Sequence, residues 1–167
     1  MGCLGVRFAL SDAEASHLRS LASERDRLDY IQMDVEESYF ADQSEYMAES
    51  DKAWDAIHKA LTNGRLTWDG GEYPLNHVVL AGEVLYTESD YIMSLKSPGQ
   101  VRDIAAALPT VSESEFRRRC FAIDPDAYGL PVDESDFEYT WNWFQRVRRL
   151  YVLAAAEGRD VLFTASQ

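Results

Sequence analysis

The feature that most constrains the fold is a long amphipathic segment over residues 135–157. Its apolar side chains recur at helical spacing: Phe137, Trp141, Phe144, Val147, Tyr151 and Ala154. A helix with so long an apolar face needs a large partner surface, which the rest of the chain must supply. Gly158 is a typical helix stop, and the apolar run 161–164 predicts a strand after it.

Further helices are marked by serines that pair with an acid or amide three residues later: Ser11 with Glu14, Ser97 with Gln100, and Ser112 with Glu115. These capping boxes predict helices over about 11–22, 97–108 and 112–121. A weaker helical pattern covers 24–35, and 36–49 fits either a helix or a loop.

Short apolar segments predict strands over 3–9 and 91–95, and Gly82 divides two further apolar runs, 77–81 and 83–86. Strands therefore lie near both termini, between helices that dominate the chain. This order favours an α+β fold, with residues 1–167 forming a single compact domain, mostly helical, around a small mixed sheet. A chain of 167 residues is long enough to bury an ordinary core without metals or disulfides.

The net charge of −13 excludes two classes of partner. Nucleic acids and anionic membranes both require a basic face. No apolar run is long enough for a membrane span, and the first residues lack the basic start of a leader peptide. We therefore expect a cytoplasmic protein, a monomer or weak dimer, whose partner is a basic protein or a small molecule.

Neither the cysteines nor the histidines indicate a metal or cofactor. Cys3 and Cys120 are too few and too far apart for a zinc site, and the chain has three histidines without a metal-binding spacing. Two buried, reduced thiols are the simplest interpretation. The alternative is a reactive Cys120, since three arginines precede it and cations lower the pKa of a thiol.

The best candidate site lies on a predicted helix over 51–62, which Asn63 and Gly64 end. With Trp54 at 0° on a helical wheel, the core face between about 240° and 340° comprises Ala53, Ile57, Ala60 and Leu61. His58, Asp51 and Asp55 follow at about 40°, 60° and 100°, just outside that face. The side near about 150°, which we expect to face solvent, carries Lys52 and Lys59.

Three roles are open to this edge of the helix. A histidine oriented by a carboxylate can act as a general base, which makes His58, Asp51 and Asp55 candidate catalytic residues. The same edge, with Trp54, can bind a ligand. In the structural alternative, His58 bonds a backbone carbonyl or a loop and fastens the helix to the sheet.

Other candidate binding residues lie in the irregular segment after this helix and in the long C-terminal helix. Tyr73, His77 and Glu83 belong to the 63–83 segment, which is long for a loop, and such loops often carry function. Trp143 lies at the border of the apolar stripe of the long helix, where it can line a pocket or an interface.

Several stretches together point to a family: Met1-Gly2-Cys3-Leu4-Gly5, Asp51-Lys52-x-Trp54-Asp55-x-Ile57-His58-x-x-Leu61-Thr62, Pro74-Leu75, Gly82-Glu83, Tyr91, the helix after Ser97-Pro98, and the ending from Arg149-Leu150-Tyr151 through Ala154-Ala155-Ala156 to Val161-Leu162-Phe163. With these segments the chain resembles the YfbM-like family of small bacterial proteins, which is classed as a domain of unknown function. The resemblance spans essentially the whole chain and implies a compact α+β domain in a bacterial cytoplasm. It implies no activity, cofactor or catalytic residue.

Two hypotheses follow. The first is a binding or interaction module, without enzymatic activity, whose pocket or patch lies around the 51–62 helix and the 63–83 segment. The second is a small hydrolase or transferase that uses His58 with Asp51 or Asp55. A solvent-open cleft with His58 bonded to a carboxylate favours the enzyme. A buried His58 bonded to backbone alone argues against it.

Overall fold

The computed structural model describes residues 4–88 and 90–166. Cys3, where the first predicted strand begins, lies outside them. The strands are β1 (Gly5–Leu10), β2 (Met47–Asp51), β3 (Glu83–Tyr86), β4 (Tyr91–Lys96) and β5 (Asp160–Ser166). The α-helices are α1 (Asp12–Ser20), α2 (Glu24–Tyr30), α3 (Glu36–Asp42), α4 (Ala53–Leu61), α5 (Pro98–Ala107), α6 (Glu113–Phe121), α7 (Pro125–Tyr128) and α8 (Glu134–Glu157). The shorter turns are η1 (Ile31–Val35), η2 (Ser44–Tyr46), η3 (Leu75–His77) and η4 (Leu108–Thr110).

One sheet lies at the centre of the fold, in the order β2-β1-β5-β4-β3. All of its strand pairs are antiparallel, so the expected mixed sheet is wrong in this respect. Apolar runs locate strands, but their directions depend on how the connections pack. Here β5 begins opposite the end of β1, with Asp160 paired to Leu10.

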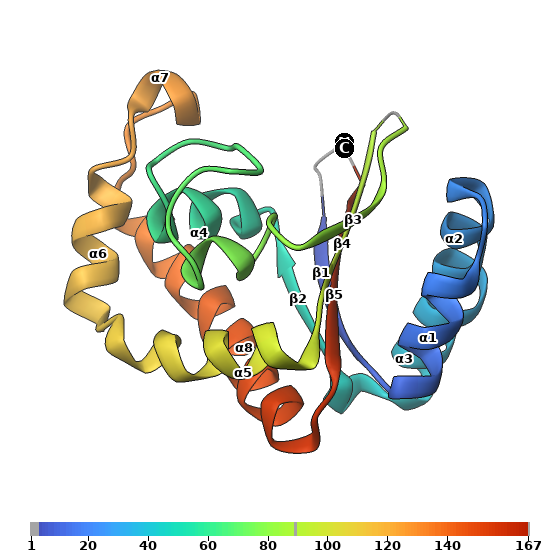
Figure 1. The fold of residues 1–167 in the computed structure, drawn as a ribbon. Coiled ribbons are helices and arrows are strands. Elements are labelled where there is room, and N and C mark those ends of the chain that lie inside the picture. Colours follow the sequence, from blue (N-terminus) through green and yellow to red (C-terminus); the bar gives the residue numbers. More distant parts are fainter. Residues whose placement is uncertain (1–3, 89, 167) are drawn as a thin grey trace.

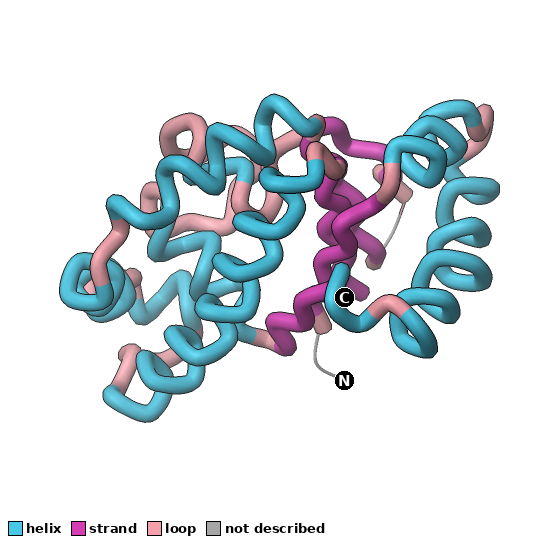
Figure 2. The backbone as a smooth tube through the Cα atoms, turned by 90° about the horizontal axis from the view of Figure 1, so that it is seen from below, coloured by secondary structure: helices cyan, strands magenta, loops and turns pink. Residues whose placement is uncertain are grey.

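Helices cover both faces of the sheet, which gives the three layers seen in Figures 1 and 2. On one face α1, α2 and α3 bury Phe8, Leu18 and Ile31 with their neighbours. On the other face α4, α5, α6 and α8 build a larger apolar cluster. The fold is therefore the compact, mostly helical α+β domain that the alternation of patterns predicts.

The boundaries of most helices follow their predicted caps. The Ser11, Ser97 and Ser112 side chains each accept a bond from the backbone N–H three residues later. The α8 helix, from Glu134 to the left-handed Gly158, has the predicted length and buries the predicted apolar face. None of the helices in residues 4–88 and 90–166 is long and apolar enough to cross a membrane.

The two apolar runs on either side of Gly82 differ in structure. Residues 83–86 form β3, whereas 77–81 run from η3 through an irregular turn. The predicted start of the 51–62 helix is wrong, because Asp51 ends β2 with a φ of 44° and α4 starts at Ala53. The open stretch 36–49 divides into α3, η2 and most of β2.

Candidate functional site

His58 lies on α4, completely buried between this helix and the loop that follows it. Its Nε2–H donates to the carbonyl of Thr67 at 3.0 Å, which leaves Nδ1 unprotonated and without a partner among the described residues. Burial lowers the pKa of His58 to about 4, despite the bond to Thr67 and nearby Asp55. The imidazole is therefore neutral and fastens the loop to the helix.

The two aspartates predicted to act with His58 have other partners. Asp55 pairs with the Lys59 ammonium at 2.9 Å. Asp51 accepts a 2.6 Å bond from the hydroxyl of Tyr139 on α8. The structure thus does not assemble the three candidate catalytic residues, and His58 has no open path to a substrate.

Lys59, expected to face solvent, is buried. Its ammonium also donates to the carbonyl of Ala127 at 2.8 Å and lies 5.5 Å from the ring centre of Tyr128. The prediction failed because the α7 turn covers this side of α4, which a helical wheel cannot reveal. Trp54, a candidate binding residue at the border of the core face, is buried against Phe163 of β5 and lies in the core.

Side chains from the sheet and α8 hold the 77–81 segment in place. Arg7 Nε and the Tyr151 hydroxyl both donate to the carbonyl of Val78, at 3.2 and 2.9 Å. The Lys96 ammonium donates to the carbonyl of Val79 at 2.5 Å. A buried segment without regular structure must satisfy its carbonyls in this way, which explains why an apolar run here is not a strand.

Arg7 and Lys96 are both fully buried and lie near the Phe163 ring, at 4.7 and 5.7 Å from its centre. Neither pairs with a carboxylate among the described residues. Burial lowers the pKa of Arg7 to about 10 and that of Lys96 well below its ordinary value. Their acceptors are carbonyl and hydroxyl oxygens, so this layer carries a structural role that no motif had indicated.

The predicted binding residues of the 63–83 segment divide between two places. Tyr73 contacts the His77 ring at 5.0 Å between ring centres, and its hydroxyl donates to Asp103 at 2.5 Å. Glu83, on β3, instead pairs with Arg19 of α1 at 3.1 Å. The structure does not bring these three residues to one site.

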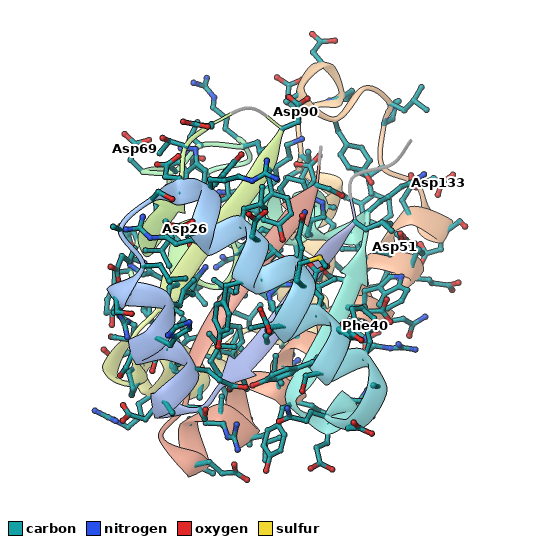
Figure 3. All side chains as sticks on the ribbon, turned by 90° about the vertical axis from the view of Figure 1, so that its right-hand side faces the viewer. Asp26, Phe40, Asp51, Asp69, Asp90 and Asp133 are labelled. Carbon is teal, nitrogen blue, oxygen red and sulfur yellow. The ribbon has the colours of Figure 1, made fainter. Side chains whose placement is uncertain are left out.

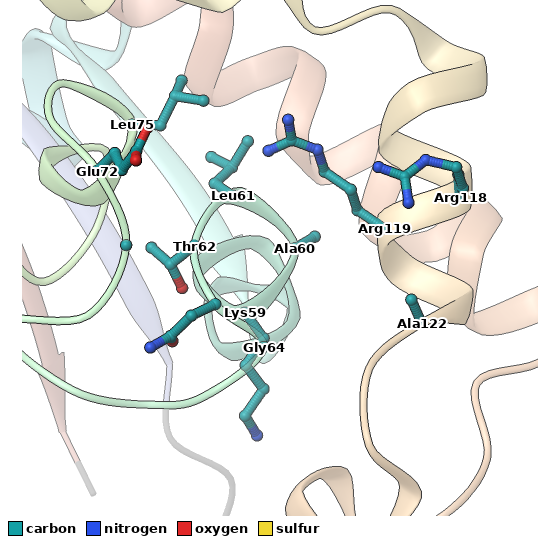
Figure 4. Close-up of a pocket in the computed structure, with 12 residues that line it drawn as sticks. Lys59, Ala60, Leu61, Thr62, Gly64, Glu72, Leu75, Arg118, Arg119 and Ala122 are labelled. Carbon is teal, nitrogen blue, oxygen red and sulfur yellow. The ribbon is translucent and has the colours of Figure 1, made fainter.

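A cleft of about 500 Å³, which we term the α4–α6 cleft, separates the end of α4 from α6. Figure 4 shows Arg118 and Arg119 projecting from α6 toward it, opposite Leu61 and Thr62. Both arginines pair with Glu115 at 2.7 Å, and their bonds lower its pKa to about 2. One carboxylate is thus shared by both arginines.

A second cleft, of about 410 Å³, opens between α3 and the sheet. We term it the acidic cleft; three carboxylates and three aromatic rings line it: Glu36, Glu49, Asp51, Phe40, Tyr91 and Trp143. Figure 3 shows Phe40 and Asp51 on the same side of the molecule, along β2. Asp51 and Trp143 are the two predicted binding residues that the structure brings together.

The carboxylates of the acidic cleft have neutral partners or none. Glu36 accepts a 3.2 Å bond from the Tyr91 hydroxyl, and burial raises the pKa of Glu36. Asp51 accepts from Tyr139, whose pKa burial and this bond raise to about 12, which keeps Tyr139 a neutral donor. None of the described residues that line this cleft is basic, although the Arg146 guanidinium lies 4.5 Å from the ring centre of Trp143. The carboxylates are therefore the groups with which a further cation would pair.

Glu36, Phe40, Glu49 and Tyr91 are not among the predicted site residues. For the first three a signal exists in 36–49, where acids and aromatics interleave, but this pattern fits either a helix or a loop. Cys120 is buried, and its burial raises the pKa of the thiol to about 12, so the reactive alternative does not hold. In residues 4–88 and 90–166, no group of three or more histidine, cysteine or acidic side chains is placed to hold a metal.

Known proteins share the sequence pattern and the fold of this chain. The family model described as "Domain of unknown function (DUF1877)" matches residues 1–164. The chain belongs to the DUF1877 family. This DUF1877 domain is also similar to the crystal structure of YfbM from Escherichia coli, titled a protein of unknown function. The TM-score is 0.67 at 18% identity, over 97% of this chain and 99% of that one.

At that identity the likeness concerns the fold alone. Curated proteins give no match to the sequence. The resemblance predicted from the Asp51–Thr62 stretch is confirmed, and the family brings this DUF1877 domain no activity or ligand. Function has to be argued from the site.

Proposed function

We propose that this domain is a binding module that takes a basic side chain of a partner protein into the acidic cleft. The observation that carries the proposal is the lining itself: three carboxylates and three aromatic rings without a basic side chain among the described residues. Aromatic faces attract cations, and a partly desolvated carboxylate such as Glu36 gains most from one. The overall charge of −13 would bring a basic partner to the surface at an increased rate.

The buried state of His58 supports a module without His58-dependent catalysis. Its ring reaches only the carbonyl of Thr67, and the α4–α6 cleft beside its helix presents arginines already paired with Glu115. The alternative hydrolase or transferase therefore has no supporting observation at these residues. The proposed site is displaced from the 63–83 segment toward β2, where Asp51 and Trp143 meet.

The test is titration with Nα-acetyl-lysine methylamide, followed by the amide NMR shifts of the protein. The neutral norleucine analogue is the ligand control. Replacing Glu36 by Gln or Trp143 by Ala should weaken binding about two- to fivefold each, the range of a half-exposed ion pair or cation–aromatic contact. Thermal unfolding of each variant checks that the fold is intact.

The matched control is Glu37→Gln, which removes the same charge from the same helix at an exposed residue outside the cleft. Its affinity should equal that of the unmodified protein. If Glu37→Gln weakens binding as much as Glu36→Gln does, attraction is spread over the acidic surface and the proposal is wrong. Equal binding of the norleucine analogue would also contradict it.

A further inference from the structure

The two edges of the sheet differ in a way that bears on the partner. At β3, Arg27 donates to the carbonyl of Leu85 at 3.2 Å, and Glu24 accepts from the N–H of Thr87 at 3.0 Å. Side chains of α2 thus occupy main-chain groups at that edge, a common protection of edge strands. At the other end of the sheet, β2 is paired with β1 alone among the described strands.

A groove of about 580 Å³, which we term the β2 groove, follows this edge. Three consecutive residues of the strand line it: Met47, Ala48 and Glu49. Successive side chains of a strand point to opposite faces, so a hollow that all three line has to lie along the strand edge. The groove therefore gives access to the main chain of β2.

The walls of the β2 groove come from both helical layers. Phe40 and Glu45 contribute from the α3 side, and Arg146, Arg149, Leu150 and Leu153 from α8. Phe40 and Glu49 also line the acidic cleft, so the two hollows share part of their walls. A strand laid along β2 would run beside both.

We propose that the partner binds as an added strand: an extended segment that pairs with β2 and in which basic residues alternate with apolar ones. The inference rests on the proposed function, because the acidic cleft would take one of the basic side chains. Basic side chains would lie on the α3 side, where they meet Glu45 and Glu49. The side chains on the α8 side would be the apolar ones, because that wall combines Leu150 and Leu153 with Arg146 and Arg149, which repel a further cation. Strand addition of this kind takes affinity from main-chain bonds and specificity from alternate side chains.

Charge disfavours a second copy of this chain as the occupant. In a symmetric antiparallel pairing centred on β2, the exposed Glu49 would face Glu49 of the other copy. Like charges directly opposite each other destabilise a strand pair. A basic residue of the partner opposite Glu49 would instead attract this carboxylate and stabilise the strand pair.

The test uses three capped heptapeptides: alternating lysine and valine, the same sequence methylated on every main-chain nitrogen, and alternating glutamate and valine. The lysine–valine peptide should bind and slow amide hydrogen exchange in Met47–Asp51. The methylated peptide keeps the charge but cannot donate main-chain bonds, so its affinity should fall at least about tenfold. The glutamate peptide should not bind.

The outcomes separate the two proposals. Equal binding of both lysine peptides, without protection of Met47–Asp51, overturns strand addition but leaves cation binding in place. Failure of both lysine peptides and of Nα-acetyl-lysine methylamide overturns both. Protection of Met47–Asp51 in the protein alone, with a dimer in sedimentation, assigns the edge to a second copy and overturns the inference. The Glu49→Lys variant should lose the lysine–valine peptide, whereas Glu37→Gln should retain it.

Discussion

Protonation of His58 should control a measurable part of the acid stability of this domain. The ring is completely buried, its Nε2–H is bonded to Thr67, and its Nδ1 has no partner among the described residues. A proton added to Nδ1 would thus be buried without an acceptor. Burial accordingly holds the pKa near 4, against about 6.5 in an unfolded chain.

The sign and size of this change in stability follow from the linkage between proton binding and folding. Between pH 6.5 and 4 the unfolded chain binds a proton that the folded chain does not, so the free energy of unfolding falls as pH falls. The full difference in pKa corresponds to at most about 3 kcal/mol, of which about 2 kcal/mol is lost between pH 7 and pH 4.5. At the urea dependence usual for such a chain, this moves the unfolding midpoint by about 1 M.

The assay compares urea unfolding at pH 7 and pH 4.5 for the unmodified protein and His58→Gln. Glutamine can still donate to Thr67 but does not titrate. Between pH 7 and pH 4.5 the free energy of unfolding of His58→Gln should therefore fall by about 2 kcal/mol less than that of the unmodified protein. His17→Gln, at an exposed position on α1, is the control and should keep the full loss. If the free energy of unfolding falls by the same amount in the unmodified protein and in His58→Gln, this account of the buried imidazole is wrong.

Two further substitutions test the packing around α4. A Cβ on Gly5 would lie 2.8 Å from Cδ1 of Trp54, so Gly5→Ala should lower the free energy of unfolding by about 1–3 kcal/mol. Gly99→Ala, whose nearest neighbouring atom is 3.8 Å away, should cause little change. Lys59→Ala should cost about 2–3 kcal/mol, because Asp55 and a backbone carbonyl lose their donor, whereas exposed Lys52→Ala should stay within about 0.5 kcal/mol. Chemical denaturation measures all of these, and a similar cost for the two lysines would contradict the burial of Lys59.

The predictable parts of the fold are those whose signal is local. Capping serines place the starts of α1, α5 and α6, and the spacing of apolar residues places α8 with its buried face. One structural expectation for the candidate site was equally local. A histidine beside the core face of a helix and just before a loop can bond that loop, and His58 does so through Thr67.

The errors arise where distant segments decide the outcome. Residues 77–81 have the composition of a strand, but Arg7, Lys96 and Tyr151 compete for their carbonyls from elements far along the chain. Lys59 has the spacing of a solvent-facing residue, yet a turn almost 70 residues later covers it. Helical or strand periodicity describes one element at a time, so it cannot show contacts that distant segments make with that element.

The acidic cleft could not be predicted for a related reason, and this bears on where function should be sought. Its lining comes from α3, α8 and the four strands β1, β2, β4 and β5, so it exists only after the sheet has formed. On the opposite face of the sheet, buried cations are bonded to carbonyl oxygens of the same chain. In the acidic cleft, Glu36 is partly buried beside a tyrosine, burial raises its pKa, and it has no basic partner among the described residues. Because folding satisfies the first set of charges and not the second, a partner has most to contribute at the second.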